Sequence, residues 1–290
     1  MQNTSLKKIA IKDVAAAITE DLGTGDITTN LLGKDKNKLT VALVKTNQEA
    51  ILCGRIWFDN AFKNIQKKYR GPLKITWYKK DGDKIKNGET ICKIVAPLRT
   101  ILVAERTALN FIQLLSGTAT KTNLYSQEIK NNKIKLLDTR KTIPGLRAAQ
   151  KYAVKCGGGF NHRFGLYDQV LIKENHITAE LNSYEGFLDK ISKIINFKKV
   201  SIEVETLAEL KILLKYKPKN ILLDNFSLSN IKKASKMINK KITTIEISGG
   251  INLKNIKKYS NLDIDFISIG DLTKNISSIE INYFTTGNHK

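Results

Sequence analysis

The chain has 290 residues, 41% of them hydrophobic and 26% charged, so it is long enough for a substantial core and has the composition of a globular protein. The N-terminal residues lack an apolar run of signal-peptide length, and no stretch reaches the roughly 18 apolar residues of a membrane helix, so we expect a cytoplasmic protein without a membrane partner. The net charge of +22 comes from scattered lysines without a basic tail or aromatic-basic interleaving, which disfavours nucleic-acid binding as the main function.

The first part of the chain predicts a mixed α+β domain. Apolar residues from Ile9 to Ile18 recur at helical spacing, and a second helical pattern covers residues 54–69. Strand patterns are found at residues 41–44, 50–53, 73–78 and 90–95. Asn87-Gly88 predicts a hairpin turn between the last two of these strands.

A break in a helical pattern marks the expected domain boundary. The pattern begins at Leu98 and stops at Ser116-Gly117-Thr118, after which a second helix is expected toward Ile129. We therefore expect an N-terminal domain of residues 1–115 and a catalytic domain of residues 116–274, with residues 275–290 packing back on the first.

Beyond this hinge, short apolar runs alternate with helical stretches, as in parallel βα units. The runs are residues 133–137, 169–172, 200–204, 220–223, 244–247 and 265–269. An open doubly wound sheet and a closed barrel both fit this alternation. Polar residues follow each run directly, and this favours a barrel, because the carboxyl ends of barrel strands converge on one mouth where active sites lie.

Basic residues gather near these strand ends, where they are suited to binding carboxylates and phosphates through charge-assisted hydrogen bonds. They are Arg140, Lys141, His162, Arg163 and Lys173. For any one of them a solvated surface position is the simpler interpretation, so the prediction of an anion site depends on their clustering.

Acidic residues and glycines follow other strands. Glu203 and Asp224 belong to consecutive strands and would project into the same mouth, where they would hold Mg²⁺ or a ribose diol, the alternative being an ion pair with a lysine. Ser248-Gly249-Gly250 and Gly270 end the last two strands, where glycine lets backbone N–H groups approach a phosphate. A strand-to-helix turn requires glycine for conformational reasons as well.

The sequence contains no motif for a cysteine metal site, a disulfide framework, or the binding of ATP or a dinucleotide. Three cysteines, Cys53, Cys92 and Cys156, have neither metal-knuckle nor disulfide spacing and are expected to be reduced and structural. There is no GxxxxGK[ST] phosphate loop, and no GxGxxG follows an early strand, so ATP and dinucleotide binding are disfavoured.

Taken in order, the motifs resemble those of the quinolinate phosphoribosyltransferases over almost the whole chain. The matching segments are residues 20–28, 105–110, Asp138-Thr-Arg-Lys-Thr142, 144–147, Gly157-Gly-Gly-Phe-Asn-His-Arg163, 171–173, 175–176, the strand of Glu203, Leu223-Asp-Asn225 and Ser248-Gly-Gly250. The resemblance implies an α/β fold of the type II phosphoribosyltransferase kind, with an N-terminal α/β sandwich joined to an incomplete, seven-stranded α/β barrel. It also implies a homodimer whose active site is completed by the neighbouring subunit, while further assembly stays open.

The activity that the resemblance implies is transfer of phosphoribosyl from phosphoribosyl pyrophosphate to quinolinate with decarboxylation, which yields nicotinate mononucleotide, pyrophosphate and CO₂ for NAD biosynthesis. Mg²⁺ is the expected cofactor. The alternatives are a paralogous phosphoribosyltransferase for nicotinate or another ligand, which a comparison of quinolinate with nicotinate would detect, and a basic nucleic-acid-binding protein, which would show salt-dependent binding and no turnover.

Residue roles follow from the same resemblance. Arg106 is expected to reach across the dimer interface to the pyridine carboxylates. Arg140, His162, Arg163 and Lys173 are expected to line the same acidic ligand, Lys141 to serve the phosphoribosyl donor, Glu203 and Asp224 to serve ribose and magnesium, and Ser248, Gly249, Gly250 and Gly270 to hold the 5′-phosphate. Of these, Lys141, Lys173, Glu203 and Asp224 are the expected catalytic residues. Asp271 departs from the family pattern, in which a small residue is expected after the glycine, and a carboxylate beside a phosphate is unfavourable unless it points away.

Overall fold

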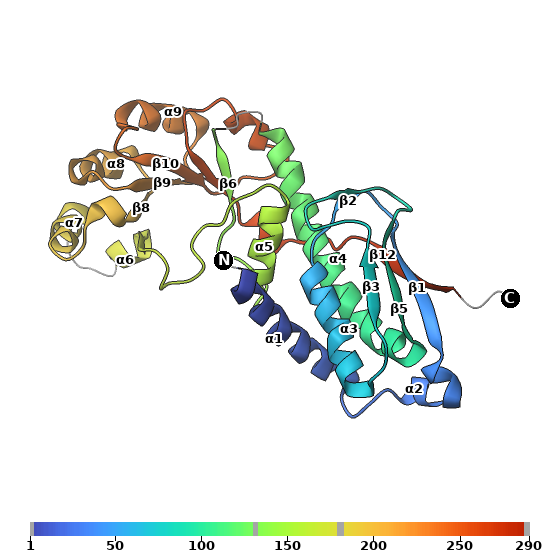
Figure 1. Ribbon diagram of the computed structural model, residues 1–290. Coiled ribbons are helices and arrows are strands. Elements are labelled where there is room, and N and C mark those ends of the chain that lie inside the picture. Colours follow the sequence, from blue (N-terminus) through green and yellow to red (C-terminus); the bar gives the residue numbers. More distant parts are fainter. Residues whose placement is uncertain (1–2, 130–132, 179–182, 287–290) are drawn as a thin grey trace. The chain divides into compact units, whose positions relative to one another are not determined.

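The computed structural model describes residues 3–129, 133–178 and 183–286, and the chain divides into two compact units (Figure 1). The first contains Met1–Asn123, Thr142–Gly158 and Thr273–Lys290, and the second contains Leu124–Lys141 and Gly159–Leu272. These units differ from the predicted contiguous segments 1–115 and 116–274, because residues 142–158 return to the first unit. No helix within the described residues is both long and apolar enough to cross a membrane.

The predicted hinge at Ser116-Gly117-Thr118 is wrong, because one continuous helix, α4 (Leu98–Glu128), runs through it. These residues are small because they are packed. Ser116 is fully buried, and its hydroxyl accepts from the backbone N–H of Cys53 at 2.9 Å and donates to the Cys53 carbonyl. A Cβ at Gly117 would lie 2.3 Å from the backbone oxygen of Ser277. Ser116 and Gly117, which resemble a turn in the sequence, are therefore small because the helix packs closely against neighbouring segments at this point.

The first unit contains a four-stranded antiparallel sheet in the order β12-β1-β5-β3. Its strands are β1 (Leu39–Thr46), β3 (Lys74–Trp77), β5 (Thr90–Pro97) and β12 (Ile281–Thr286). A second sheet pairs β2 (Ala50–Ile51) with β4 (Lys84–Ile85). The Asn87-Gly88 turn connects β4 to β5, and not β3 to β5 as predicted, because the two-residue strand β4 is too short to be recognised from a pattern.

Helices complete the first unit. They are α1 (Asn3–Leu22), α2 (Ile27–Asn30), η1 (Gly33–Asn37), α3 (Arg55–Tyr69) and α5 (Arg147–Cys156). Helices α1 and α3 pack side by side (Figure 1), as their apolar spacing predicts. Trp57 and Phe58 of α3 are buried, and the indole N–H of Trp57 donates to Asp13 of α1 at 2.9 Å.

The second unit is built on a six-stranded parallel sheet in the order β6-β11-β10-β9-β8-β7. The strands are β6 (Lys135–Leu137), β7 (Leu171–Ile172), β8 (Ser201–Val204), β9 (Asn220–Asp224), β10 (Thr244–Ser248) and β11 (Phe266–Ser268). The helices between them are α6 (Glu174–Thr178), α7 (Tyr184–Ser192), η2 (Phe197–Lys199), α8 (Leu207–Leu213), η3 (Leu214–Tyr216), α9 (Leu228–Met237), η4 (Ile256–Tyr259) and α10 (Asp271–Lys274). All six predicted strands are present.

An additional strand position lies on the other side of β6. Phe160 forms a parallel bridge with Leu137, so the strand positions run from Phe160 through β6 and around to β7. The sequence pattern missed this position because a single bridging residue after three glycines leaves no apolar run. The architecture is an α/β sandwich with an incomplete α/β barrel, and the predicted fold class is confirmed.

Candidate active site

A cavity of about 370 Å³ lies in the second unit, at the carboxyl ends of its strands. It is lined by Thr139, Arg140, Lys141, His162, Arg163, Leu171, Lys173, Glu203, Leu222, Asp224, Glu246, Ser248 and Ser268. Eight of the predicted site residues are among them, contributed by six different strand ends. The parallel sheet therefore brings together side chains that lie more than 100 positions apart in sequence, such as Arg140 and Ser248.

The cavity contains two guanidinium groups. Arg163 is only 8% exposed, and its Nη1 donates to the backbone carbonyl of Gln169 at 2.9 Å. Burial lowers the pKa of the Arg163 guanidinium, and the nearby charge of Arg140 lowers this pKa further. An anion bound between the two groups would relieve both effects, so this part of the cavity is suited to a carboxylate or a phosphate.

An ion pair joins β7 to β8 at the cavity wall. The Lys173 Nζ lies 2.5 Å from Glu203 Oε2, and Glu203 is 8% exposed. The lysine interaction that the sequence left open for Glu203 is therefore present. Asp224, at the end of β9, accepts a hydrogen bond from the side-chain amide of Asn225 at 2.9 Å. Both carboxylates line the same cavity, as expected for residues on neighbouring strands.

Glycines at two strand ends permit close approach. A Cβ at Gly270 would lie 3.0 Å from Lys141 Cδ, so the lysine chain passes directly over this glycine. Gly249 has a φ of +96°, and a Cβ there would lie 2.1 Å from Asn225 Oδ1. Gly250 also has a positive φ, +62°, but nothing lies within 4 Å of its Cβ position. The two adjacent glycines are thus required for different reasons.

This difference predicts unequal effects of two matched substitutions. Gly249→Ala should destabilise the protein by about 3 kcal/mol, because a steric clash adds to backbone strain, whereas Gly250→Ala should lower the free energy of unfolding by only about 1 kcal/mol from strain alone. Urea unfolding of both variants measures this difference. Equal losses of stability would show that the contact with Asn225 does not constrain this turn.

The Asp271 carboxylate points away from the predicted phosphate site. It begins α10, and its Oδ2 accepts a hydrogen bond from the Tyr125 hydroxyl at 2.7 Å. Burial raises the pKa of Tyr125, and the Asp271 carboxylate raises it further, so the phenol stays protonated as the donor. Asp271 is not among the residues that line the cavity, and its carboxylate is hydrogen-bonded to Tyr125 instead.

Arg106 is the predicted site residue that belongs to the first unit. It is exposed on α4, and it is not among the residues that line the cavity. Its role toward a ligand stays a prediction. Conversely, five lining residues were missed: Thr139, Leu171, Leu222, Glu246 and Ser268.

One of the missed residues left a signal in the sequence. Glu246 stands between Ile245 and Ile247 inside an apolar strand, and it is 2% exposed. A buried carboxylate is rare without partners, so a glutamate inside an apolar strand is a signal of a functional or paired residue. Leu171 and Leu222 form apolar walls and are indistinguishable in sequence from ordinary core residues.

Comparisons with known proteins agree with one another over both units. Residues 26–116 match the family model of the quinolinate phosphoribosyl transferase N-terminal domain, and residues 118–283 match that of the C-terminal domain. A probable nicotinate-nucleotide pyrophosphorylase (carboxylating) from Bacillus subtilis is 34% identical, covering 92% of this chain and 90% of the relative. A protein with the same name from Methanocaldococcus jannaschii is 37% identical, with 96% and 97% covered. The structure of the nicotinate-nucleotide pyrophosphorylase from Francisella tularensis is 41% identical, with 97% of each chain covered and a TM-score of 0.87.

Proposed function

This chain belongs to the quinolinate phosphoribosyltransferase family, and from that membership we propose how its cavity carries out the family reaction. It is a pentosyltransferase of NAD biosynthesis that joins quinolinate to the phosphoribosyl group of phosphoribosyl pyrophosphate, with release of pyrophosphate and CO₂. The observation that carries the proposal is the convergence of Arg140, Arg163, Lys141 and Lys173 in one cavity with the carboxylates Glu203 and Asp224.

The guanidinium end of the cavity binds the pyridine dicarboxylate in this proposal. Arg140 and Arg163 bind its carboxylates by charge-assisted hydrogen bonds, Lys173 lies beside them, and His162 forms part of the wall. Two carboxylates on one ring would offset the repulsion between the two guanidinium groups, because each guanidinium then gains a negative partner. A ligand with one carboxylate would leave one of the two guanidinium groups without a negative partner beside the like charge of the other, which disfavours nicotinate.

The phosphoribosyl donor occupies the carboxyl ends of β6, β10 and β11 in this proposal. Lys141, which passes over Gly270, binds the pyrophosphate, and the Ser248-Gly249-Gly250 turn receives the 5′-phosphate on backbone N–H groups. Asp271 accepts a hydrogen bond from Tyr125 and is not among the residues that line the cavity. The two substrates thus lie side by side in one cavity.

The donor set fits Mg²⁺. Within the described residues no group of three or more His, Cys, Asp or Glu side chains is arranged to hold a metal. Mg²⁺ is commonly bound by one or two carboxylates while substrate phosphates and water supply the other oxygens, and Glu203 and Asp224 provide two carboxylates in the cavity. When bound with the donor, Mg²⁺ would neutralise charge on the departing pyrophosphate.

The protein's own residues orient the reactants. Cations at both carboxylates fix the ring so that its nitrogen faces the ribose C1 carbon, and such positioning contributes several kcal/mol. The C1–oxygen bond to pyrophosphate breaks as the nitrogen–C1 bond forms, and Lys141 stabilises the negative charge of the leaving group. The ring nitrogen is then cationic and accepts the electron density left when the 2-carboxylate departs as CO₂, after which a proton takes its place on the ring.

Two further aspects belong to the proposal. The active enzyme is a homodimer in which Arg106 of one subunit completes the cavity of the other, for which the exposed position of Arg106 on α4 is suited. We place the enzyme in the cytoplasm, where a reducing environment maintains the free thiols of Cys53 and Cys92.

The proposed reaction predicts equal release of two products. Incubation with phosphoribosyl pyrophosphate, Mg²⁺ and quinolinate labelled in its 2-carboxylate should release labelled CO₂ and nicotinate mononucleotide in equal amounts, and omission of Mg²⁺ should abolish both. Chromatography of the nucleotide and trapping of the gas measure the two products. Turnover of nicotinate in place of quinolinate would instead assign the chain to a paralogous phosphoribosyltransferase.

A further inference from the structure

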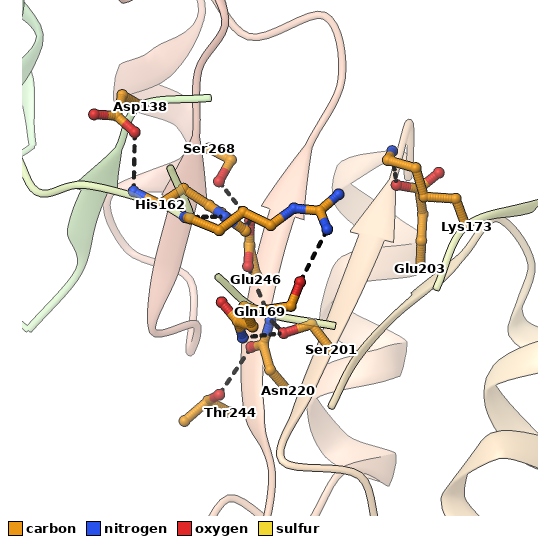
Figure 2. Close-up of polar contacts among 11 residues, drawn as sticks. Asp138, His162, Gln169, Lys173, Ser201, Glu203, Asn220, Thr244, Glu246 and Ser268 are labelled. Atoms are coloured by element: carbon orange, nitrogen blue, oxygen red, sulfur yellow. Dashed lines mark hydrogen bonds and ion pairs between the residues drawn. The ribbon is translucent and has the colours of Figure 1, made fainter. Parts of the chain in front are cut away.

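Glu246, which lines the cavity, lies at the centre of a buried hydrogen-bond network (Figure 2). Its Oε2 accepts from the side-chain amide of Asn220 at 2.8 Å. Its Oε1 accepts from the Ser268 hydroxyl and lies 3.3 Å from His162 Nε2. Burial raises the pKa of Glu246, but the hydrogen bond and electrostatic interaction with His162, together with the hydrogen bonds from Ser268 and Asn220, outweigh this effect and lower the pKa overall. The carboxylate is therefore ionised although it is 2% exposed.

The protonation of His162 is defined from both sides of its ring. Its Nδ1 accepts a hydrogen bond from the backbone N–H of Arg163 at 2.7 Å, so this nitrogen has no proton. The ring proton must then lie on Nε2, which faces Glu246. A second proton on Nδ1 would oppose the Arg163 N–H group. Both ring nitrogens of His162 are thus engaged by the protein, and this arrangement favours the tautomer with its proton on Nε2.

The network continues from Glu246 to the side chain of Arg163. Asn220 donates to the Ser201 hydroxyl at 3.3 Å, and its carbonyl oxygen accepts from Thr244 at 2.8 Å. The side-chain amide of Gln169 donates to the same Ser201 hydroxyl at 2.9 Å, while the Gln169 backbone carbonyl accepts from the Arg163 guanidinium. The contacts thus form a closed ring that begins at the backbone of Arg163 and returns to its side chain.

We propose that Glu246 is a positioning residue for the carboxylate subsite, holding His162 in the Nε2-protonated tautomer and, through the closed ring, fixing the guanidinium of Arg163. Glu246 does this through the groups that contact its two carboxylate oxygens. The inference rests on the proposed function where it concerns quinolinate, whereas the tautomer of His162 is a property of the protein alone.

The first test therefore does not depend on activity. The chain has 3 histidines, so ¹⁵N-labelled histidine gives few signals, and a His176→Gln, His289→Gln double variant leaves His162 alone. Long-range ¹H–¹⁵N spectra should show His162 as the neutral Nε2–H tautomer at neutral pH. An Nδ1–H tautomer or an imidazolium in the otherwise unaltered protein would overturn the proposal, whether or not quinolinate is the substrate.

The second test uses Glu246→Gln, which preserves size but replaces an acceptor by a donor. If the amide nitrogen faces Asn220, two donors oppose each other; if it faces His162, the Nε2–H tautomer loses its acceptor. We expect the His162 signals to change and the KM for quinolinate to rise about 10- to 100-fold. This is the size of the loss in affinity or activity when the hydrogen-bond partner that orients a metal-ligating histidine is removed. The KM for phosphoribosyl pyrophosphate should change by less than about threefold, since its cations lie outside the ring.

Two further variants keep this test decisive. Glu185→Gln makes the same chemical change at an exposed surface pair with Lys215 and should leave both KM values unaltered. If Glu246→Gln does not fold, Ser268→Ala removes one donor to Glu246 and should give a smaller rise in the quinolinate KM. Equal changes in both KM values, or unchanged His162 signals with a weakened quinolinate site, would assign Glu246 a merely structural role.

Discussion

Replacing Arg163 with leucine should lower kcat/KM for quinolinate by about 1000-fold, because removing the charged partner of a buried carboxylate costs about 2 to 5 kcal/mol. The guanidinium is buried, hydrogen-bonded to the Gln169 carbonyl and repelled by Arg140, so nothing else in the cavity replaces it. Arg163→Lys should still lose about 100-fold, because an ammonium group retains the charge but lacks the planar fork that binds a carboxylate through two hydrogen bonds.

Steady-state kinetics with quinolinate varied at saturating phosphoribosyl pyrophosphate measures this loss. Arg70→Lys is the matched control, since Arg70 is exposed in the first unit and should tolerate the same change without loss of activity. The KM for phosphoribosyl pyrophosphate should stay near its original value in every variant. A folded Arg163→Lys enzyme that retains more than about one third of the original kcat/KM would exclude bidentate binding by Arg163.

The barrel could be predicted from the sequence because its strands are buried on both faces. Runs such as Asn220–Asp224 and Thr244–Ser248 stand out as short apolar segments, and the polar residue that ends each run necessarily lies at the cavity. The position at Phe160 could not be found in this way, since it pairs through a single residue. A strand can be recognised from this sequence where several consecutive residues pair and are therefore apolar.

Other errors came from local signals that tertiary packing overrides. Ser116-Gly117-Thr118 has the composition of a turn, yet the helix continues because Ser116 satisfies the backbone of Cys53 and Gly117 allows the chain at Ser277 to pass. The contact of His162 with Glu246 joins residues that lie 84 positions apart in the printed sequence. Contacts of this kind, and the tautomer that they favour, follow from the three-dimensional structure alone.

Arg106 completes the carboxylate subsite from the neighbouring subunit in our proposal, and mixing two inactive variants should therefore restore activity. Arg106→Ala and Lys141→Ala should each lose most of their activity as homodimers. In a mixed dimer, one cavity carries both changes and the other carries neither. Random exchange of subunits should recover about one quarter of the original activity per subunit, because half of the dimers are mixed and each of these has one intact cavity.

A second mixture serves as the control for this experiment. Lys141 and Lys173 line the same cavity of one subunit, so Lys141→Ala mixed with Lys173→Ala leaves every cavity with one defect and should recover nothing. Differently tagged subunits, purified through both tags, establish that exchange has occurred. Recovery in the first mixture but not in the second would assign Arg106 to the partner's cavity. If neither mixture recovers activity despite proven exchange, each subunit binds quinolinate without its neighbour. The positive charges of Arg140 and Arg163 would then be neutralised by the carboxylates of the ligand alone.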